Sequence, residues 1–116
     1  MLYHRNELKS EIREKPRGGA GTATYLHYTE DQGKTHKNIE IIAEVNLPPG
    51  SSIGTHAHTD NMEFYIILKG KGIASDNGTE KPISEGDVLI TGNGHTHGIR
   101  NTGDIPLVFH AIVVKN

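Results

Sequence analysis

The sequence has no cysteine, which excludes disulfide bonds and thiolate chemistry. It also lacks an excess of either charge, because 12 Lys and Arg residues stand against 14 Asp and Glu residues and the basic ones are scattered. Binding to nucleic acid or to an anionic membrane surface generally needs clustered basic residues. We therefore expect neither as a partner.

No hydrophobic run is long enough to span a membrane. The longest, residues 105–114, contains Pro106 and His110 and is much shorter than the about 20 residues that a transmembrane helix needs. The first 15 residues carry charges where a secretory signal would have a continuous apolar segment. The sequence thus predicts a cytoplasmic protein, and its 116 residues suit one domain with a single core.

Fourteen glycines and five prolines divide the chain into short segments rich in residues that favour β-strands. Apolar and polar side chains alternate along residues 38–47, as in a strand with one buried face. Turn signals such as Asn77-Gly78 separate the segments. The sequence predicts an all-β sandwich or barrel of about eight or nine strands. The clearest expected strands are residues 22–28, 38–47, 62–70, 87–91 and 106–114.

Residues 1–20 are expected to form an N-terminal arm or helix ahead of a single domain at residues 21–116. Asn6 would cap a helix over residues 7–14, and Pro16 would follow its end. An arm that packs on a partner subunit is an equally good interpretation of this segment. Both alternatives stay open.

Closely spaced histidines mark the candidate functional site. His56 and His58 are two residues apart, so on a strand both side chains project from one face, about 6.5 Å apart. Glu63 has the wrong parity for that face unless the chain reverses just before it, after which an antiparallel strand would turn it back toward the histidines. A third imidazole would come from His95 or His97. Three neutral imidazoles and a carboxylate bind a divalent cation and leave coordination positions open.

This pattern resembles the cupins. The first cupin motif places a glycine, a His-x-His pair, a glutamate and a second glycine at fixed spacing, and all five positions are matched here. The matching residues are Gly50, His56, His58, Glu63 and Gly70.

The second cupin motif is a glycine, a Pro-x-Gly turn, a histidine and an asparagine. Gly86, Gly94, His97 and Asn101 match it, whereas Gly92 stands where the family has proline. This departure concerns a turn residue and bears on loop rigidity more than on metal binding.

The resemblance implies a double-stranded β-helix, the cupin jelly-roll barrel, over residues 21–116. It also implies a homodimer and one divalent transition metal ion, which would be Mn, Fe, Zn or Ni. Within the family the chain looks most like small monocupins described as oxalate-decarboxylase-like. The implied metal ligands are His56, His58, Glu63 and His97, with no ligand role for His95.

Two functions suit such a site. One is a metal-dependent enzyme of decarboxylase, isomerase or oxygenase type that acts on a small carboxylate or oxygenated metabolite, with Glu63 as the candidate catalytic group. The other is a non-catalytic protein that binds or senses a small acid. The candidate ligand contacts are Tyr65, Arg17, Arg100 and His110.

The remaining histidines have simpler interpretations. His4, His27 and His36 have no partner pattern and are expected at the surface. His110 lies in the last apolar segment, where it would be a core histidine with hydrogen-bond partners or a group behind the metal site. The first interpretation of His110 is favoured.

Overall fold

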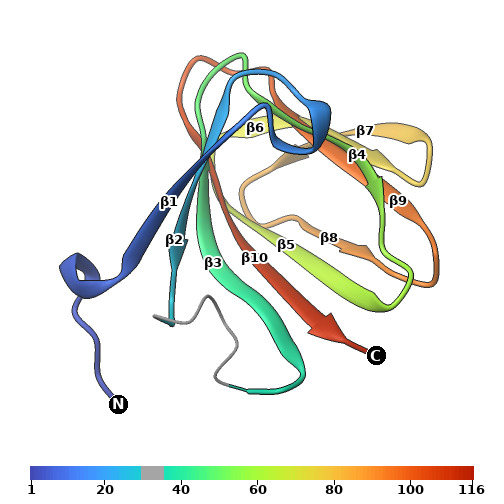
Figure 1. The fold of residues 1–116 in the computed structure, drawn as a ribbon. Coiled ribbons are helices and arrows are strands. Elements are labelled where there is room, and N and C mark those ends of the chain that lie inside the picture. Colours follow the sequence, from blue (N-terminus) through green and yellow to red (C-terminus); the bar gives the residue numbers. More distant parts are fainter. Residues whose placement is uncertain (30–35) are drawn as a thin grey trace.

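The computed structural model describes residues 1–29 and 36–116 and shows an all-β protein (Figure 1). Within this described part, ten strands form two antiparallel sheets, one in the order β1-β2-β3-β10-β5-β8 and the other in the order β4-β9-β6-β7. The helices described are two 3-10 turns, η1 (Arg5–Glu7) and η2 (Pro16–Gly18), and neither could cross a membrane. The strands are β1 (Lys9–Glu14), β2 (Thr22–His27), β3 (Ile39–Leu47), β4 (Ser52–Ala57), β5 (Asn61–Lys69), β6 (Lys71–Asp76), β7 (Thr79–Ser84), β8 (Val88–Thr91), β9 (Thr96–Asn101) and β10 (Leu107–Lys115).

The two sheets enclose one hydrophobic core. Side chains alternate along the long strands, so that β3 buries Val45 and Leu47 while Glu44 and Asn46 face outward. Tyr65 and Phe109 of the same sheet are almost fully buried, and the smaller sheet contributes Ile53 and Ile99. The alternation predicted for residues 38–47 is confirmed over residues 43–47, whereas residues 39–42 are all half-buried next to an irregularity in the pairing with β10.

The C-terminal strand lies in the middle of the larger sheet. The last strand, β10, pairs antiparallel with β3 on one side and with β5 on the other. The tight hairpin between β6 and β7 turns at Asn77 and Gly78, both with positive φ, as the sequence predicts. These pairings give the jelly-roll arrangement that the cupin resemblance implies.

The helix expected over residues 7–14 is wrong. Residues 9–14 form the edge strand β1, which pairs with β2 from Lys9 opposite His27 to Glu14 opposite Thr22. An isolated helix of this length is marginal in water, and pairing with a neighbouring strand satisfies the same backbone groups. A helix here would bury its apolar side chains on one face, but Ile12 is 68% exposed.

Candidate metal centre

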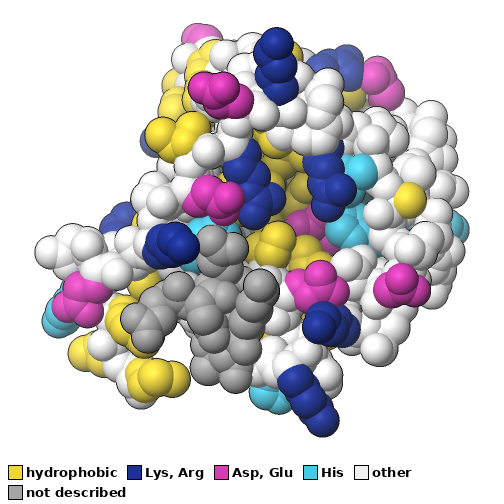
Figure 2. Space-filling view, in the orientation of Figure 1, with side chains coloured by type: hydrophobic (Ala, Val, Ile, Leu, Met, Phe, Trp, Pro, Cys, Tyr) yellow, Lys and Arg dark blue, Asp and Glu magenta, His cyan; other side chains and the backbone are white. Residues whose placement is uncertain are grey.

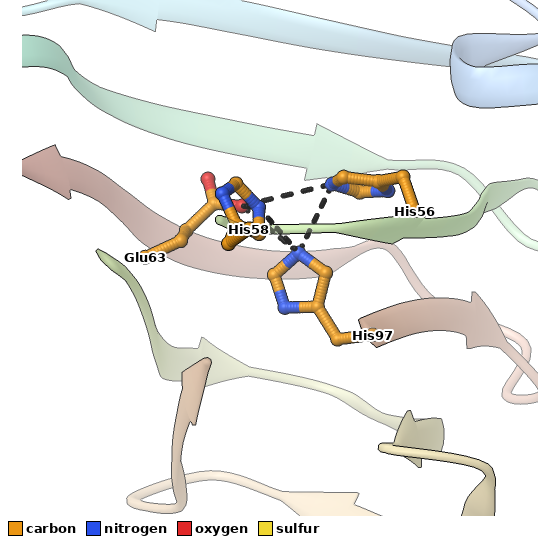
Figure 3. Close-up of side chains that lie close together, drawn as sticks. All are labelled: His56, His58, Glu63 and His97. Atoms are coloured by element: carbon orange, nitrogen blue, oxygen red, sulfur yellow. Dashed lines mark hydrogen bonds and ion pairs between the residues drawn. The ribbon is translucent and has the colours of Figure 1, made fainter. Parts of the chain in front are cut away.

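Four side chains from both sheets converge at the inner end of a cavity between the sheets (Figure 3). His56 is on β4, His58 follows the end of β4, Glu63 is on β5 and His97 is on β9. One nitrogen or oxygen atom from each lies within 4.8 Å of the others. The structure therefore brings together the four residues that the cupin resemblance implies as ligands.

An irregularity in β4 sets the direction of the first histidine. Ile53 pairs with Ile99 and His56 pairs with His97, so three steps along β4 correspond to two steps along β9. Such a bulge reverses the alternation of side chains locally. Ile53 and His56 can therefore both face inward, although a regular strand would place them on opposite faces.

The segment between β4 and β5 crosses from one sheet to the other. The reversal expected before Glu63 is present, but β5 pairs with β8 and β10 and not with β4. Two backbone hydrogen bonds hold His58 in this crossing. The His58 N–H donates to the His95 carbonyl, and the His58 carbonyl accepts from the Gly94 N–H. Glu63 and Tyr65 then share the buried face of β5, as predicted.

Each of the three imidazoles uses Nδ1 for a hydrogen bond to an oxygen outside the cluster. The acceptors are Gly54 O for His56 at 2.7 Å, Asn61 Oδ1 for His58 at 2.6 Å and Thr91 Oγ1 for His97 at 2.8 Å. Carbonyl oxygens only accept, so Nδ1 carries the proton in the first two rings, and the threonine hydroxyl accepts equally well in the third. This tautomer leaves each Nε2 lone pair directed at the centre.

The distances within the cluster fit a cation. His97 Nε2 lies 3.1 Å from His56 Nε2 and 3.2 Å from His58 Nε2. Glu63 Oε1 lies 3.0 Å from Nε2 of both His58 and His97, and 3.9 Å from Nε2 of His56. Ligand atoms about 2.1 Å from an ion and about 90° apart are about 3 Å from each other. Four lone pairs this close repel unless a positive charge lies among them, so these residues fit a divalent ion.

Protons compete for the same atoms. Burial alone would raise the pKa of Glu63, but hydrogen bonds with the three imidazoles outweigh burial and hold that pKa well below its usual range. The hydrogen bond to Glu63 raises the pKa of His58. Burial lowers the pKa of His97. The carboxylate is thus ionised at neutral pH, and it attracts either a proton on an imidazole or a metal ion.

Aromatic side chains support the cluster from behind. The Tyr65 ring stacks on the His97 ring with centroids 4.7 Å apart and an interplanar angle of 17°, and Phe109 packs against Tyr65. Burial raises the pKa of Tyr65 well above its usual value, the Glu63 carboxylate adds to this, and the Arg17 charge opposes it. The Tyr65 hydroxyl is therefore protonated throughout the physiological range.

The cavity above the cluster has a volume of about 320 Å³ and a cationic rim. Figure 2 shows a hollow with Lys and Arg side chains at its edge and His, acidic and hydrophobic side chains on its floor. The rim comes from β1 and η2 and contains Arg13, Lys15 and Arg17 together with Glu14, while Glu40 of β3 also lines the cavity. The sequence-predicted contacts Tyr65 and Arg17 both line it.

Two other predicted contacts lie elsewhere. Arg100 is exposed on the outer face of β9, where its Nη1 donates to Glu80 Oε1 at 2.6 Å. His110 is half-buried on the outer face of β10, with its ring edge-on to Tyr28 at 5.5 Å. Neither interpretation of His110 holds, because the inner face of β10 is taken by its odd-numbered residues.

The surface position expected for His27 is wrong. His27 is fully buried on the inner face of β2, where Nε2 lies 2.9 Å from Glu11 Oε1 and the ring stacks on Tyr25. A carboxylate partner and an aromatic neighbour, both from the alternating inward positions of β1 and β2, stabilise the buried imidazole, whereas its Nδ1 has no hydrogen-bond partner among the described residues. His4, His36 and His95 are exposed.

Three residues that complete the site are not evident from the sequence. Asn61 and Thr91 resemble ordinary turn and strand-end residues, and only the structure reveals them as partners of the imidazoles. Arg13 is obscured by the helical interpretation, because only on a strand does it share an inward face with Glu11. The sequence signal for the strand is the alternation of charged Glu11 and Arg13 with apolar Ile12 between them.

The chain is similar to several known proteins. The sequence model of the cupin domain matches residues 43–114. An oxalate-binding protein of Thermotoga maritima is 38% identical over 114 residues, which cover 98% of this chain and 93% of that protein. A crystal structure from the same organism, described as a predicted oxalate decarboxylase, is 37% identical with a TM-score of 0.91 over the whole of both chains. A polyketide cyclase of Streptomyces resistomycificus, 19% identical, shares the fold with a TM-score of 0.77 over 98% of this chain and 78% of its own.

Proposed function

The chain belongs to the cupin domain family, and from this premise we propose that it is a metal-dependent protein that binds a small carboxylic acid of the oxalate class. The observation that carries the proposal is the convergence of three imidazole Nε2 atoms and one carboxylate oxygen at the floor of a cavity with a cationic rim. The relative named as an oxalate-binding protein supports the class of ligand.

The ligand set contains nitrogen and oxygen without sulfur, which Mn, Fe, Zn and Ni all accept. When bound, such an ion would supply Lewis acidity to the oxygen atoms of an acid ligand. His56, His58, Glu63 and His97 would hold it. The Nδ1 hydrogen bonds and the Tyr65 ring fix the imidazoles in advance, so little conformational freedom is lost on binding.

Arg17 is the cation that we assign to the acid ligand. Its backbone is in the left-handed region, with φ 53° and ψ 34°, an unfavourable conformation for arginine that functional sites often retain. Close packing holds this turn, because a Cβ on Gly54 would lie 2.1 Å from the Arg17 carbonyl oxygen. The guanidinium can pair with a carboxylate, and the protonated Tyr65 hydroxyl can donate a hydrogen bond to it.

Metal analysis and calorimetry test this function. Protein purified without added metal should contain close to one divalent ion per chain, and oxalate should bind only to the metal-loaded form. His56→Ala should lose both properties, whereas His95→Ala, a change at an exposed histidine of the second motif, should keep both. Metal-loaded protein that binds no oxalate would overturn the proposal.

Turnover of the bound acid is the second candidate function, favoured by two further carboxyl groups, Glu14 and Glu40, that line the cavity. Decarboxylation of the oxalate dianion breaks its C–C bond, releases CO₂ and adds one proton to the remaining carbon to give formate. Glu63 is committed to the imidazoles, so a proton donor would have to be another group. Release of formate from oxalate, lost in Glu14→Gln or Glu40→Gln, would establish an enzyme, and its absence would leave a binding protein.

The outer face of the larger sheet supports a homodimer. Ile90, Phe64, Ile112 and Ile42 lie side by side across four strands of this face. Val88 and Ile90 are 52% and 53% exposed. An apolar sheet face of this extent is usually covered in solution, and a second copy related by a two-fold axis would bury the same row on both chains.

A further inference from the structure

The strand β1 has an unusual distribution of side chains. It is an edge strand of the larger sheet, and its inward positions carry Glu11 and Arg13 while Ile12 points outward and is 68% exposed. A strand that only covers a hydrophobic core directs its apolar side chains inward and its charged side chains outward. The inverted pattern suggests that β1 serves the cavity and not the core.

Contacts on two sides fix the Arg13 guanidinium. Its Nη2 donates to Glu11 Oε1 at 3.1 Å, and its Cζ lies 4.0 Å from the centroid of the Tyr25 ring. Glu11 is held in turn by His27 Nε2 at 2.9 Å, and the buried His27 ring stacks on Tyr25. Arg13, Glu11, His27 and Tyr25 thus form one connected unit, and the side chain of Arg13 has lost much of its freedom before any ligand arrives.

This unit leaves hydrogen-bond donors available. Glu11 is the one acceptor that Arg13 has among the described residues, and it engages only Nη2, so that Nε and Nη1, with three of the five N–H groups, have no acceptor there. The Arg13 side chain is 33% exposed and lines the same cavity as His56, His58 and Glu63. A fixed guanidinium with free N–H groups, facing a cavity, is suited to bind a carboxylate or phosphate.

The cavity has room for a ligand that reaches both the metal centre and the rim. Its volume of about 320 Å³ is about ten times the share of one water molecule in the liquid, whereas the oxalate skeleton has six heavy atoms. Arg13 also precedes residues 43–114, the part of the chain that matches the general cupin pattern, so it is a feature added to that pattern.

We propose that Arg13 forms an anion subsite at the outer end of the cavity, with Glu11 as its positioning residue. This inference rests on the proposed function. The preferred ligand then carries two acidic groups, one at the metal centre and the other, separated by a short chain, at Arg13. A monoacid of equal length would fill the cavity but leave the Arg13 guanidinium unpaired.

Calorimetry with two four-carbon acids tests the subsite on metal-loaded protein. Succinate, a diacid, should bind about tenfold or more tightly than butyrate, the monoacid of equal length, because it gains a charge-assisted pair with Arg13. Arg13→Gln should weaken succinate binding by about tenfold and change butyrate binding by less than about twofold. Glu11→Gln should weaken succinate binding by a smaller factor, because the guanidinium remains but is held less firmly. Arg100→Gln, which removes an arginine paired with a glutamate outside the cavity, should behave like the unmodified chain.

The outcomes separate the two proposals. Equal affinity for succinate and butyrate in the unmodified chain, or a preference for succinate that survives Arg13→Gln, would overturn the subsite while oxalate binding still upheld the proposed function. Binding of none of the three acids by metal-loaded protein would overturn the proposed function as well. Metal content and melting temperature, measured on each variant, show whether a lost preference comes from the ligand site or from unfolding.

Discussion

At the scale of single residues, the Nδ1 partners of the imidazoles tune the metal affinity that the ligand atoms provide. Thr91 is buried and its hydroxyl accepts from His97 Nδ1, which keeps the proton away from Nε2. Without an acceptor at Nδ1, the ring can rotate or take the other tautomer, in which Nε2 carries a proton and cannot bind a metal.

Thr91→Val should therefore lower metal affinity by about tenfold while the fold stays intact, because loss of such an outer partner typically costs one to two orders of magnitude. Competition with a coloured chelator measures the affinity. Thr55→Val is the matched control, since Thr55 is exposed on β4, the strand that pairs with the strand of His97. Equal affinity in the two variants would mean that the hydrogen bond at Nδ1 does not tune the centre.

The carboxyl group of Glu11 should make stability depend on pH. Hydrogen bonds to Arg13 and His27 lower the pKa of Glu11 below its usual value. A group whose pKa is lower in the folded state stabilises the fold above its unfolded pKa, and this contribution is lost as the pH falls through the folded pKa. Because the side chain is about one-third exposed, the contribution should be below about 1 kcal/mol.

Urea denaturation of metal-free protein checks this expectation. The free energy of unfolding should be lower for Glu11→Gln than for the unmodified chain at pH 7, and the two should converge as the pH falls below the usual pKa of glutamate. The pair of Glu80 with Arg100 offers a control, since both are exposed and Glu80→Gln should change stability less. A constant difference between the chains from pH 7 to pH 3 would show that ionisation of Glu11 does not contribute.

At the scale of elements, close backbone contact joins η2 to β4. A Cβ on Gly54 would lie 2.1 Å from the Arg17 carbonyl oxygen, and one on Gly19 would lie 2.1 Å from the Ser52 carbonyl oxygen. The turn that carries Arg17 can approach the strand this closely only because both positions are glycine. The two glycines thus fix how closely the turn that carries Arg17 packs on β4.

Gly54→Ala should push η2 away from β4. The overlap should lower the free energy of unfolding by about 1–3 kcal/mol, and oxalate affinity should fall because Arg17 moves. Thermal melts and calorimetry measure the two effects. Gly103→Ala, where the nearest atom to the new Cβ is a flexible Lys71 carbon at 3.4 Å, should be close to neutral. Unchanged oxalate binding in a destabilised Gly54→Ala protein would argue against a role for Arg17.

Sequence patterns predict those elements whose side-chain spacing repeats, and fail where tertiary contacts decide. The strand at residues 38–47 and the residues of the metal centre follow from alternation and motif spacing. The β4 bulge does not, because the inward direction of Ile53 and His56 depends on the register with β9. The strand β1 does not follow from the sequence either. Its apolar residues have helical spacing, but pairing with β2 and the contacts of Glu11 with His27 and of Arg13 with Tyr25 fix the segment as a strand.

At the scale of the whole molecule, the site joins the two sheets. His56 and His97 belong to the smaller sheet, whereas Glu63 and Arg13 belong to the larger one. A ligand that engages residues of both sheets couples them, and a separation of the sheets would disassemble the centre. The space between the sheets thus contains both the hydrophobic core and the metal centre. The outer faces of the sheets take part in neither and are available for other contacts.

The apolar row on the outer face of the larger sheet gives the last prediction. With a chain mass of 12.7 kDa, the protein should have about twice this mass by light scattering if the row is shared between two copies. Ile90→Glu should yield monomers, because burying an unpaired carboxylate in an apolar interface costs several kcal/mol. Ile105→Glu changes an isoleucine of similar exposure in a loop and should remain dimeric. Since Ile90 points away from the cavity, the monomeric variant should keep its metal, and an unchanged mass for Ile90→Glu would place the contact between copies on another surface.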